Sequence, residues 1–394
     1  MDPRIVWLGV GSFAMSTVGF VFSSLLPAIA GETHVSVPSA GYLIMAFSLA
    51  YAVGAPVLSA VMGEADRRRV LALTILAFVC GNIVAATSGS FGGLLAAQIL
   101  MGGTAGLYAA TAQATAIALA GPEHRARAIA VVLGGTTFAV ALGAPAGSLI
   151  ANLWGWRGTF VAIAVLGAAC ASILWVRLPR DMHGTHLPLS QRFRAIALPG
   201  ITASLLVTLL YLAGGFVMVS YLAPLAMDGA GLSAMALPAL LLAFGAGAVL
   251  GNLGSGYLSD RFGATTVVTL ALLLSSAICV AMASVVTFLP HALAGPILIG
   301  LMVPWGIIGW SFPPAQASRI VGRSPEIAHL TLSLNASAMY FGIALGTVVG
   351  GRILEFSSAA SLGFFAAGFP LIALAVLLAT RKSMQAGAPS RLAV

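Results

Sequence analysis

The sequence predicts an all-α membrane protein whose twelve transmembrane helices form two pseudo-symmetric bundles of six. Three observations predict this fold class. Hydrophobic residues make up 60% of the chain and the mean hydropathy is +1.04, and both values exceed those of a typical soluble domain. Among 394 residues, 18 are Lys or Arg and ten are Asp or Glu. These charges lie between twelve apolar stretches, each long enough to cross a hydrocarbon core of ~30 Å as a helix.

The first expected helix spans residues 5–30. Ala28-Ile29-Ala30 near its end resembles a signal-peptidase site. However, the apolar run is longer than the ~7–15 residues of a signal peptide's hydrophobic region, so we expect this helix to be retained. The other eleven helices are expected at 39–62, 70–88, 91–119, 129–152, 158–178, 196–221, 236–258, 265–288, 294–317, 328–353 and 361–380.

The longest connection, residues 179–195, is expected to be a cytoplasmic linker. It separates an N-terminal bundle at 1–178 from a C-terminal bundle with a short tail at 196–394. Asp-Arg sequences mark corresponding places in the two halves. Asp66-Arg67 ends the second helix of the first half, and Asp260-Arg261 ends the second helix of the second half, 194 residues later. Repeated halves are typical of secondary transporters, which place the substrate site near the membrane midplane between them.

The basic residues predict the orientation, because Lys and Arg gather in cytoplasmic connections. With the N-terminus inside, 16 of the 18 basic residues lie inside and only Arg157 and Arg352 lie outside. The inside set includes Arg319 and Arg323, in the connection after the tenth expected helix. The sequence therefore predicts an N-in, C-in protein of a bacterial-type cytoplasmic membrane, which we expect to be a monomer.

The formal net charge of +8 follows the same pattern, so we attribute it to topology and expect no nucleic-acid partner. Cys80, Cys170 and Cys279 lie in apolar stretches and form no CxxC pair, so neither a disulfide framework nor a metal site is expected. No Walker-type glycine loop or nucleophile–base pair points to an enzyme, and no cofactor is expected.

Longer motifs carry a resemblance to a known family. They are LLP at 25–27, GAP at 54–56, GAPAG at 143–147 with WGWR at 154–157, and GYLSDRFG at 256–263. On these motifs the chain resembles the major facilitator superfamily. Within it, the chain most resembles the twelve-helix drug–proton antiporters, in the branch of sugar and chloramphenicol exporters. The resemblance implies a transporter in the lipid bilayer that moves a small molecule by alternating access.

The resemblance also implies gating roles. A carboxylate can stabilise the positive N-terminus of a neighbouring helix, so Asp66 is expected to cap the helix at 328–353 and Asp260 the helix at 129–152. Glycines at four-residue spacing let helices approach closely, and proline favours a bend. The expected gating residues are Asp66, Arg67, Asp260, Arg261, Gly143, Pro145, Gly147, Gly346 and Gly350.

Two charges that are usual in this branch are absent. Gly19 stands in the place of an acidic residue on the first helix, and Gln98 in the place of an arginine on the fourth. Since a charge at the bilayer centre costs ~2.5–3.5 kcal/mol or more, losing both together is chemically consistent. Glu32, at the outer end of the first helix, is the best remaining candidate for proton coupling. Sodium coupling through backbone carbonyls stays open, as does an uncoupled uniporter.

Small polar and aromatic residues are the candidates for the substrate cavity. Ser16, Gly19 and Ser23 share one face of the first helix. The tenth helix, rich in Pro and Trp, is expected to be irregular. The other candidates are Gln98, Gln113, Tyr211, Trp305, Trp310, Asn335 and Tyr340. This uncharged lining suits a small uncharged or zwitterionic amphipathic substrate, and the resemblance implies export. A non-transporting receptor or scaffold is a further alternative.

Overall fold

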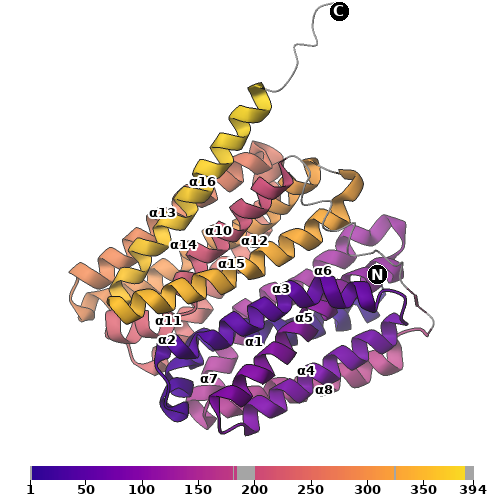
Figure 1. Cartoon of the computed structure of the whole chain (residues 1–394), viewed down its shortest axis with the longest axis horizontal. Coiled ribbons are helices and arrows are strands. Elements are labelled where there is room, and N and C mark those ends of the chain that lie inside the picture. Colours follow the sequence, from indigo (N-terminus) through magenta and orange to yellow (C-terminus); the bar gives the residue numbers. More distant parts are fainter. Residues whose placement is uncertain (1, 181, 184–199, 324, 387–394) are drawn as a thin grey trace, which may run out of the picture.

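The computed structural model describes residues 2–180, 182–183, 200–323 and 325–386. Within these ranges twelve helices are long and apolar enough to cross a membrane, which agrees with the expected all-α fold class (Figure 1). Most of the expected linker at 179–195 lies outside the described residues.

The first six spans come from the following helices. They are α1 (Arg4–Thr33), α2 (Val37–Ala40) with α3 (Tyr42–Val61), α4 (Arg67–Thr87), α5 (Phe91–Ala120), α6 (Arg125–Phe138) with α7 (Ala144–Trp154), and α8 (Trp156–Arg177). The second six are α10 (Ile201–Val219), α12 (Leu237–Phe262), α13 (Ala264–Phe288), α14 (His291–Arg323), α15 (Ala328–Phe356) and α16 (Leu362–Ala386), with the short α11 (Leu222–Pro224) after α10.

Polar side chains and glycines set the ends of several spans. The Ser90 side chain accepts a hydrogen bond from the Gly93 N–H at 3.2 Å and so caps the start of α5. Gly155 follows α7 and Gly263 follows α12, with φ angles of 79° and 84°. Residues with a β-carbon rarely adopt such angles, so glycine lets the chain turn directly into the next span.

Prolines affect two spans differently. Pro145 lies just after a π-helical turn, Ala139–Gly143, which joins α6 to α7. Such turns locally widen a helix and often occur at functional positions. By contrast, α14 is continuous although it contains Pro296, Pro304, Pro313 and Pro314. The expectation that this helix is irregular was therefore wrong. Packing against neighbouring helices lets membrane helices tolerate proline.

Both bundles contain very close helix pairs. In the N-terminal bundle, Gly102 of α5 packs on the backbone of α3, where an added β-carbon would collide with the Phe47 carbonyl oxygen. In the C-terminal bundle, Gly247 of α12 packs on α14 in the same way, against the Val303 carbonyl oxygen. Small residues permit this approach in a bilayer, where dispersion contacts replace the hydrophobic effect as the force between helices.

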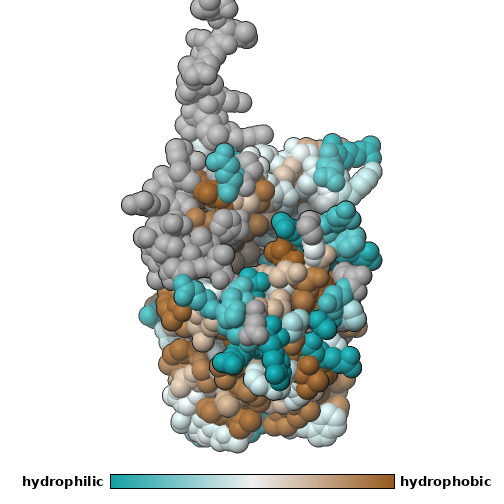
Figure 2. Space-filling model, turned by 90° about the vertical axis from the view of Figure 1, so that its right-hand side faces the viewer, coloured by the Kyte–Doolittle hydropathy of each residue, from teal (hydrophilic) through white to brown (hydrophobic). Residues whose placement is uncertain are grey.

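The two bundles lie side by side in Figure 1, the N-terminal one indigo to magenta and the C-terminal one pink to yellow. They meet mainly along α3 with α15 and along α6 and α7 with α12. We call the end of the molecule that carries Thr33 and Trp154 the outer end, and the end that carries Arg4 and Arg323 the inner end. Figure 2 faces the inner end and shows hydrophilic side chains gathered on it, with a recess between the bundles.

Candidate functional site

Aromatic side chains from both bundles meet at the middle of the interface. The Phe20 ring of α1 lies between Phe216 of α10 and Trp310 of α14, at centroid distances of 6.3 and 6.1 Å. Tyr51 of α3 and Tyr340 of α15 stack with centroids 3.5 Å apart. We call these five residues the central aromatic cluster. Because it draws on five helices of two bundles, any movement between the bundles must rearrange it.

On its outer side the cluster borders a cavity of about 10 Å³. A space of this size holds no more than about one water molecule. The Ser23 hydroxyl, which lines the cavity, donates to the Phe20 carbonyl at 2.9 Å, so its polar atom is satisfied within α1. The cavity lining is Phe20, Ser23, Val140, Ala144, Val219, Leu222, Leu241, Phe244, Met302 and Trp305.

Hydrogen bonds close the interface towards the outer end. The Asn152 side chain of the N-terminal bundle donates to the Ala234 carbonyl at 3.1 Å. The Tyr221 hydroxyl of the C-terminal bundle lies 3.5 Å from the Pro38 carbonyl and donates to the Thr347 carbonyl at 3.0 Å. These contacts separate the central aromatic cluster from the outer end.

The cross-bundle bonds nearest the inner end lie only slightly beyond the cluster. Within residues 2–180, 200–323 and 325–386, the innermost that we find are Ser337 donating to the Ala52 carbonyl at 2.9 Å and Asn252 donating to the Thr137 hydroxyl at 3.0 Å. The recess in Figure 2 lies on this side. The described contacts therefore join the bundles from the middle outwards, as expected for a conformation that faces inward.

Four predicted cavity residues lie at the interface of the bundles, and a fifth faces another helix of its own bundle. The fifth is Gly19, which faces Phe47 of α3 in the N-terminal bundle, whose Cε1 atom would be 3.5 Å from an added β-carbon. Ser23 and Trp305 line the small cavity, and Trp310 and Tyr340 belong to the central aromatic cluster.

Three others lie inside single bundles instead. Gln98 is 1% exposed within the N-terminal bundle, and its Oε1 atom has no hydrogen-bond partner among the described residues. In the C-terminal bundle, Tyr211 stacks on Phe312 and shares a hydrogen bond with Ser275 at 3.0 Å. Asn335 accepts a hydrogen bond from Thr208 at 2.7 Å and is also buried.

Two further candidates lie on the N-terminal helices. The Ser16 hydroxyl of α1 is hydrogen-bonded to Thr136 of α6 at 3.0 Å, and Gln113 is half-buried on α5. Ser16 therefore joins two helices of one bundle in this structure.

Sequence reasoning missed a buried polar network at the inner end of the C-terminal bundle. The Gln316 side chain donates to the Ser204 carbonyl at 2.8 Å and to the Thr208 hydroxyl at 3.0 Å. Its oxygen accepts a hydrogen bond from Arg319 Nε at 2.9 Å, and Arg323 donates to the Ser204 hydroxyl at 2.7 Å. Arg319 is only 6% exposed.

The expectation that Arg319 and Arg323 lie in a connection was wrong, because α14 runs to Arg323 and not to residue 317. The spacing of Gln316, Arg319 and Arg323 by three and four residues was the signal that could have placed all three on one helix face.

The glycine motifs pack as close helix contacts in both bundles. A β-carbon at Gly143 would collide with Thr17 of α1, and one at Gly147 would lie 2.7 Å from Val21 Cγ2. Pro145, between them, is buried.

In the C-terminal bundle the corresponding glycines pack on α10 and the chain after it. A β-carbon at Gly346 would collide with the Ala213 carbonyl, and one at Gly350 would lie 2.8 Å from the Tyr221 ring. The first and fifth spans of each half therefore touch through glycine.

The acidic residues of the Asp-Arg sequences do not cap the helices that we expected. Asp66 Oδ1 accepts a hydrogen bond from the Arg68 N–H at 3.2 Å and so caps its own helix, α4. Arg67 donates to the Ala114 carbonyl at 3.0 Å. Asp260 is exposed, and Arg261 donates to the Tyr257 hydroxyl at 3.1 Å. The expected caps are absent among these described contacts because the inner ends of the bundles are apart in this structure.

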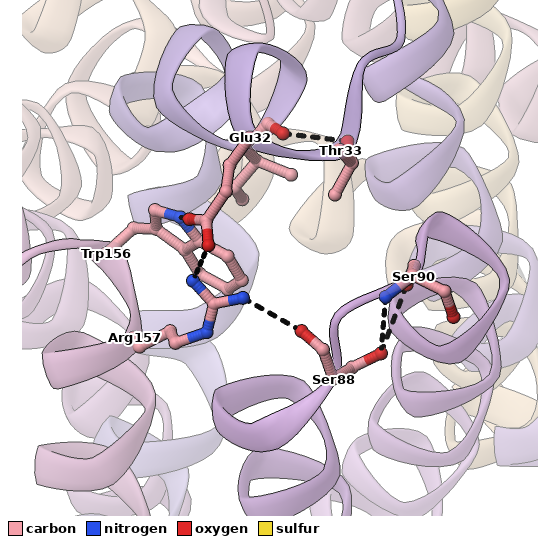
Figure 3. A network of polar contacts seen from close by, with 7 residues as sticks. Glu32, Thr33, Ser88, Ser90, Trp156 and Arg157 are labelled. Atoms are coloured by element: carbon pink, nitrogen blue, oxygen red, sulfur yellow. Dashed lines mark hydrogen bonds and ion pairs between the residues drawn. The ribbon is translucent and has the colours of Figure 1, made fainter.

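Glu32 belongs to a polar network at the outer end of one bundle (Figure 3). Its carboxylate accepts a hydrogen bond from the Trp156 indole at 2.6 Å and forms an ion pair with Arg157, which also donates to the Ser88 carbonyl at 3.0 Å. The network ties the end of α1 to the first turn of α8 and to the connection before α5. Glu32 lies far from the central aromatic cluster, at the last turn of α1.

Comparisons with known proteins agree with this architecture. The family model described as Major Facilitator Superfamily matches residues 8–329. The chain is 30% identical over 371 residues to the uncharacterized MFS-type transporter YbcL of Bacillus subtilis (strain 168), covering 94% of both chains. It is 28% identical to the inner membrane transport protein YdhP of Escherichia coli (strain K12), covering 95% of both. It is 30% identical to a chloramphenicol resistance protein of Streptomyces lividans, covering 96% of both.

Two solved structures share the fold. The human organic anion transporter MFSD10 (TETRAN) superposes with a TM-score of 0.68 at 18% identity, covering 96% of this chain and 100% of that one. A bacterial homolog of the human lysosomal transporter Spinster, in an inward-facing and occupied conformation, gives a TM-score of 0.70 at 18% identity, covering 96% of each chain.

Proposed function

The chain belongs to the major facilitator superfamily, and we propose that it is an exporter of a small uncharged or zwitterionic amphipathic molecule. As a member of this family it is a multi-pass membrane protein and a secondary transporter. We place it in the cytoplasmic membrane with both termini inside. The proposed substrate site is the central aromatic cluster, and the proposed mechanism is alternating access between the two bundles.

The observation that carries the proposal is the chemistry of the central aromatic cluster and of the small cavity beside it. The cluster and the cavity beside it contain phenol, indole and serine hydroxyl groups, and none of their residues is charged. Aromatic rings offer a substrate large apolar contacts and a polar edge. A charged substrate would need a partner of opposite charge at this depth, because an unpaired charge in the bilayer is costly. The central aromatic cluster and its cavity therefore favour substrates without net charge.

Alternating access requires contacts to break at one end and form at the other. For the site to open outward, the bonds from Asn152 to Ala234 and from Tyr221 to Pro38 must break. For the inner end to close, Asp66 and Asp260 would meet the N-termini of α15 and α6, the role that we propose for them. Export is supported by the motifs of the exporter branch and by the chloramphenicol resistance protein among the relatives.

An uncoupled uniporter is the second candidate, and one observation favours it. Glu32, the best candidate for carrying a proton, is engaged by Trp156 and Arg157 at the outer end of a single bundle. Opening and closing of the bundles does not need to break this network. Initial transport rates in proteoliposomes, measured with and without a pH or sodium gradient, separate the two candidates. Equal rates under all conditions would reject coupled export.

The substrate class can be tested on purified protein. We expect a thermal-shift screen of neutral, zwitterionic, anionic and cationic amphipathic compounds to give its largest stabilisation with neutral or zwitterionic ones. Replacing Phe20 with Ala should remove this stabilisation. Replacing Phe356, which is 84% exposed on α15, should leave it unchanged. A strongly stabilising anion or cation, or a ligand that binds F20A as well as the wild type, would reject the proposed site.

A further inference from the structure

A second cleft lies at the inner end of the N-terminal bundle, away from the interface between the bundles. Its volume is about 440 Å³, and it is formed by the start of α1 and the end of α8. The lining consists of Asp2, Pro3, Arg4, Trp7 and Arg177. Neither the proposed transport path nor the gating contacts use this cleft.

Packing between two helices builds the cleft. The Cys170 thiol of α8 donates to the Trp7 carbonyl of α1 at 3.5 Å, so this face of α8 lies against the first turns of α1. Arg177 follows seven residues later, two helical turns along the same face. Arg4 is the first residue of α1, which forms the other wall of the cleft. Both guanidinium groups therefore border one space.

The charge of the cleft is positive. The Asp2 carboxylate accepts a hydrogen bond from the Arg4 N–H at 2.8 Å and lies 3.9 Å from the Arg4 guanidinium. It neutralises at most one of the two cations. Arg177 is exposed and forms no ion pair with any residue that the structure describes. An anion with several acceptor oxygens would complement this arrangement, since guanidinium groups bind phosphate by paired hydrogen bonds.

The depth of the cleft matches the phosphate layer of a membrane. Arg4 is the first residue of its membrane span and Arg177 is the last residue of its own. Trp7, one turn deeper, is 36% exposed, and tryptophan is enriched at this level of membrane proteins. Val6 and Val176, the chain neighbours of Trp7 and Arg177, are 49% and 75% exposed and offer an apolar surface for acyl chains. A free anion would use the arginines but not this surface.

We propose that the cleft between α1 and α8 binds the phosphate headgroup of one anionic phospholipid of the cytoplasmic leaflet. Arg4 and Arg177 hold the phosphate, Trp7 packs at the glycerol level, and the acyl chains follow the exposed valines. Basic clefts between membrane helices on the cytoplasmic side are suited to such headgroups. The proposal depends on the N-in orientation and is independent of the transported substrate.

Native mass spectrometry of the detergent-purified full chain tests the proposal, with phosphatidylglycerol and phosphatidylcholine as probes. We expect one phosphatidylglycerol to be retained more strongly than phosphatidylcholine. The double variant R4Q/R177Q should weaken its retention by about 10- to 30-fold, from ~1 kcal/mol per basic residue at a membrane surface. Arg127→Gln is the matched control, because Arg127 is an exposed arginine at the start of α6, also at the inner end.

Three results would overturn the proposal. The double variant could retain phosphatidylglycerol as well as the wild type, or R127Q could weaken retention as much as R4Q/R177Q does. Alternatively, millimolar inorganic phosphate could displace the lipid from the wild type, which would identify a site for free phosphate. Equal thermal stability of wild type and double variant in phosphatidylcholine nanodiscs will show that any lost retention does not come from misfolding.

Discussion

The rings of Tyr51 on α3 and Tyr340 on α15 stack with centroids 3.5 Å apart and an interplanar angle of 14°, and so join the two bundles at the middle of their interface. Tyr51 belongs to the second membrane span and Tyr340 to the eleventh. The Ser337 hydroxyl, one turn before Tyr340, adds a hydrogen bond to the Ala52 carbonyl beside Tyr51. This pair of contacts links the proposed substrate site to the movement between the bundles.

Replacing Tyr340 with Ala should slow transport. An aromatic contact contributes about 0.5–1.5 kcal/mol beyond simple burial. If the Tyr340 ring makes such a contact with the substrate, its removal lowers the affinity for the substrate about 2- to 10-fold. Tyr340→Phe keeps the ring and should stay close to the wild-type rate. Initial efflux rates in proteoliposomes will measure both variants. A wild-type rate for Y340A would remove this residue from the proposed site.

Gly143 should tolerate no larger side chain. A β-carbon there would collide with Thr17 of α1, and overpacking of this kind costs about 1–3 kcal/mol. We therefore expect Gly143→Ala to lower the thermal midpoint of the purified protein. Gly134 lies on α6 with no atom within 4 Å of an added β-carbon, so Gly134→Ala is the matched control and should cause little change. Equal midpoints for the two variants would contradict the packing role of Gly143.

Gln316 should contribute to stability through the buried polar network of α10, α14 and α15. Gln316→Leu removes its bonds to the Ser204 carbonyl, the Thr208 hydroxyl and Arg319. Each buried group left without a partner costs about 1–3 kcal/mol, so a clear fall in the thermal midpoint is expected. Ser318→Ala, at an exposed position of the same helix, should have no such effect. A thermal midpoint of Q316L equal to that of the wild type would contradict this contribution.

Glu32 should be dispensable for the response of transport to a pH gradient. Its carboxylate is 47% exposed and is paired within one bundle, and exposed ion pairs contribute about 0–1 kcal/mol. We expect Glu32→Gln to lower stability slightly and to leave unchanged the ratio of transport rates with and without a pH gradient. If the wild type responds to the gradient and E32Q does not, Glu32 carries the coupling proton.

The fold could be predicted because it depends on local features of the sequence. Apolar runs fix the spans, and charges at their ends fix where the spans stop. The glycines near residues 143 and 346 were recognised for the same reason, since their spacing shows on one helix. The end of α14 was missed because Arg319 looks like a connection residue in sequence. Arg319 is buried beside Gln316, which accepts its Nε–H and itself donates to Ser204 of α10.

The site was harder to predict because it is made between helices. Trp310 and Tyr340 were expected in the cavity, whereas their partners Phe20 and Tyr51 were not, since nothing in the sequence shows which aromatic residues meet across the bundles. Tyr211 has the same chemistry as Tyr340 but points into its own bundle. A polar aromatic residue on a span is compatible with either position until the neighbouring helices are known.

The most direct test of alternating access is a reversible lock on the outer end. Asn152 and Ala234 are hydrogen-bonded across the bundles there, so both can be changed to Cys after Cys80, Cys170 and Cys279 have been replaced. Transport in proteoliposomes is then measured before oxidation, after disulfide formation and after reduction. We predict that the disulfide abolishes transport and that reduction restores it. Undiminished transport by fully cross-linked protein would contradict the account.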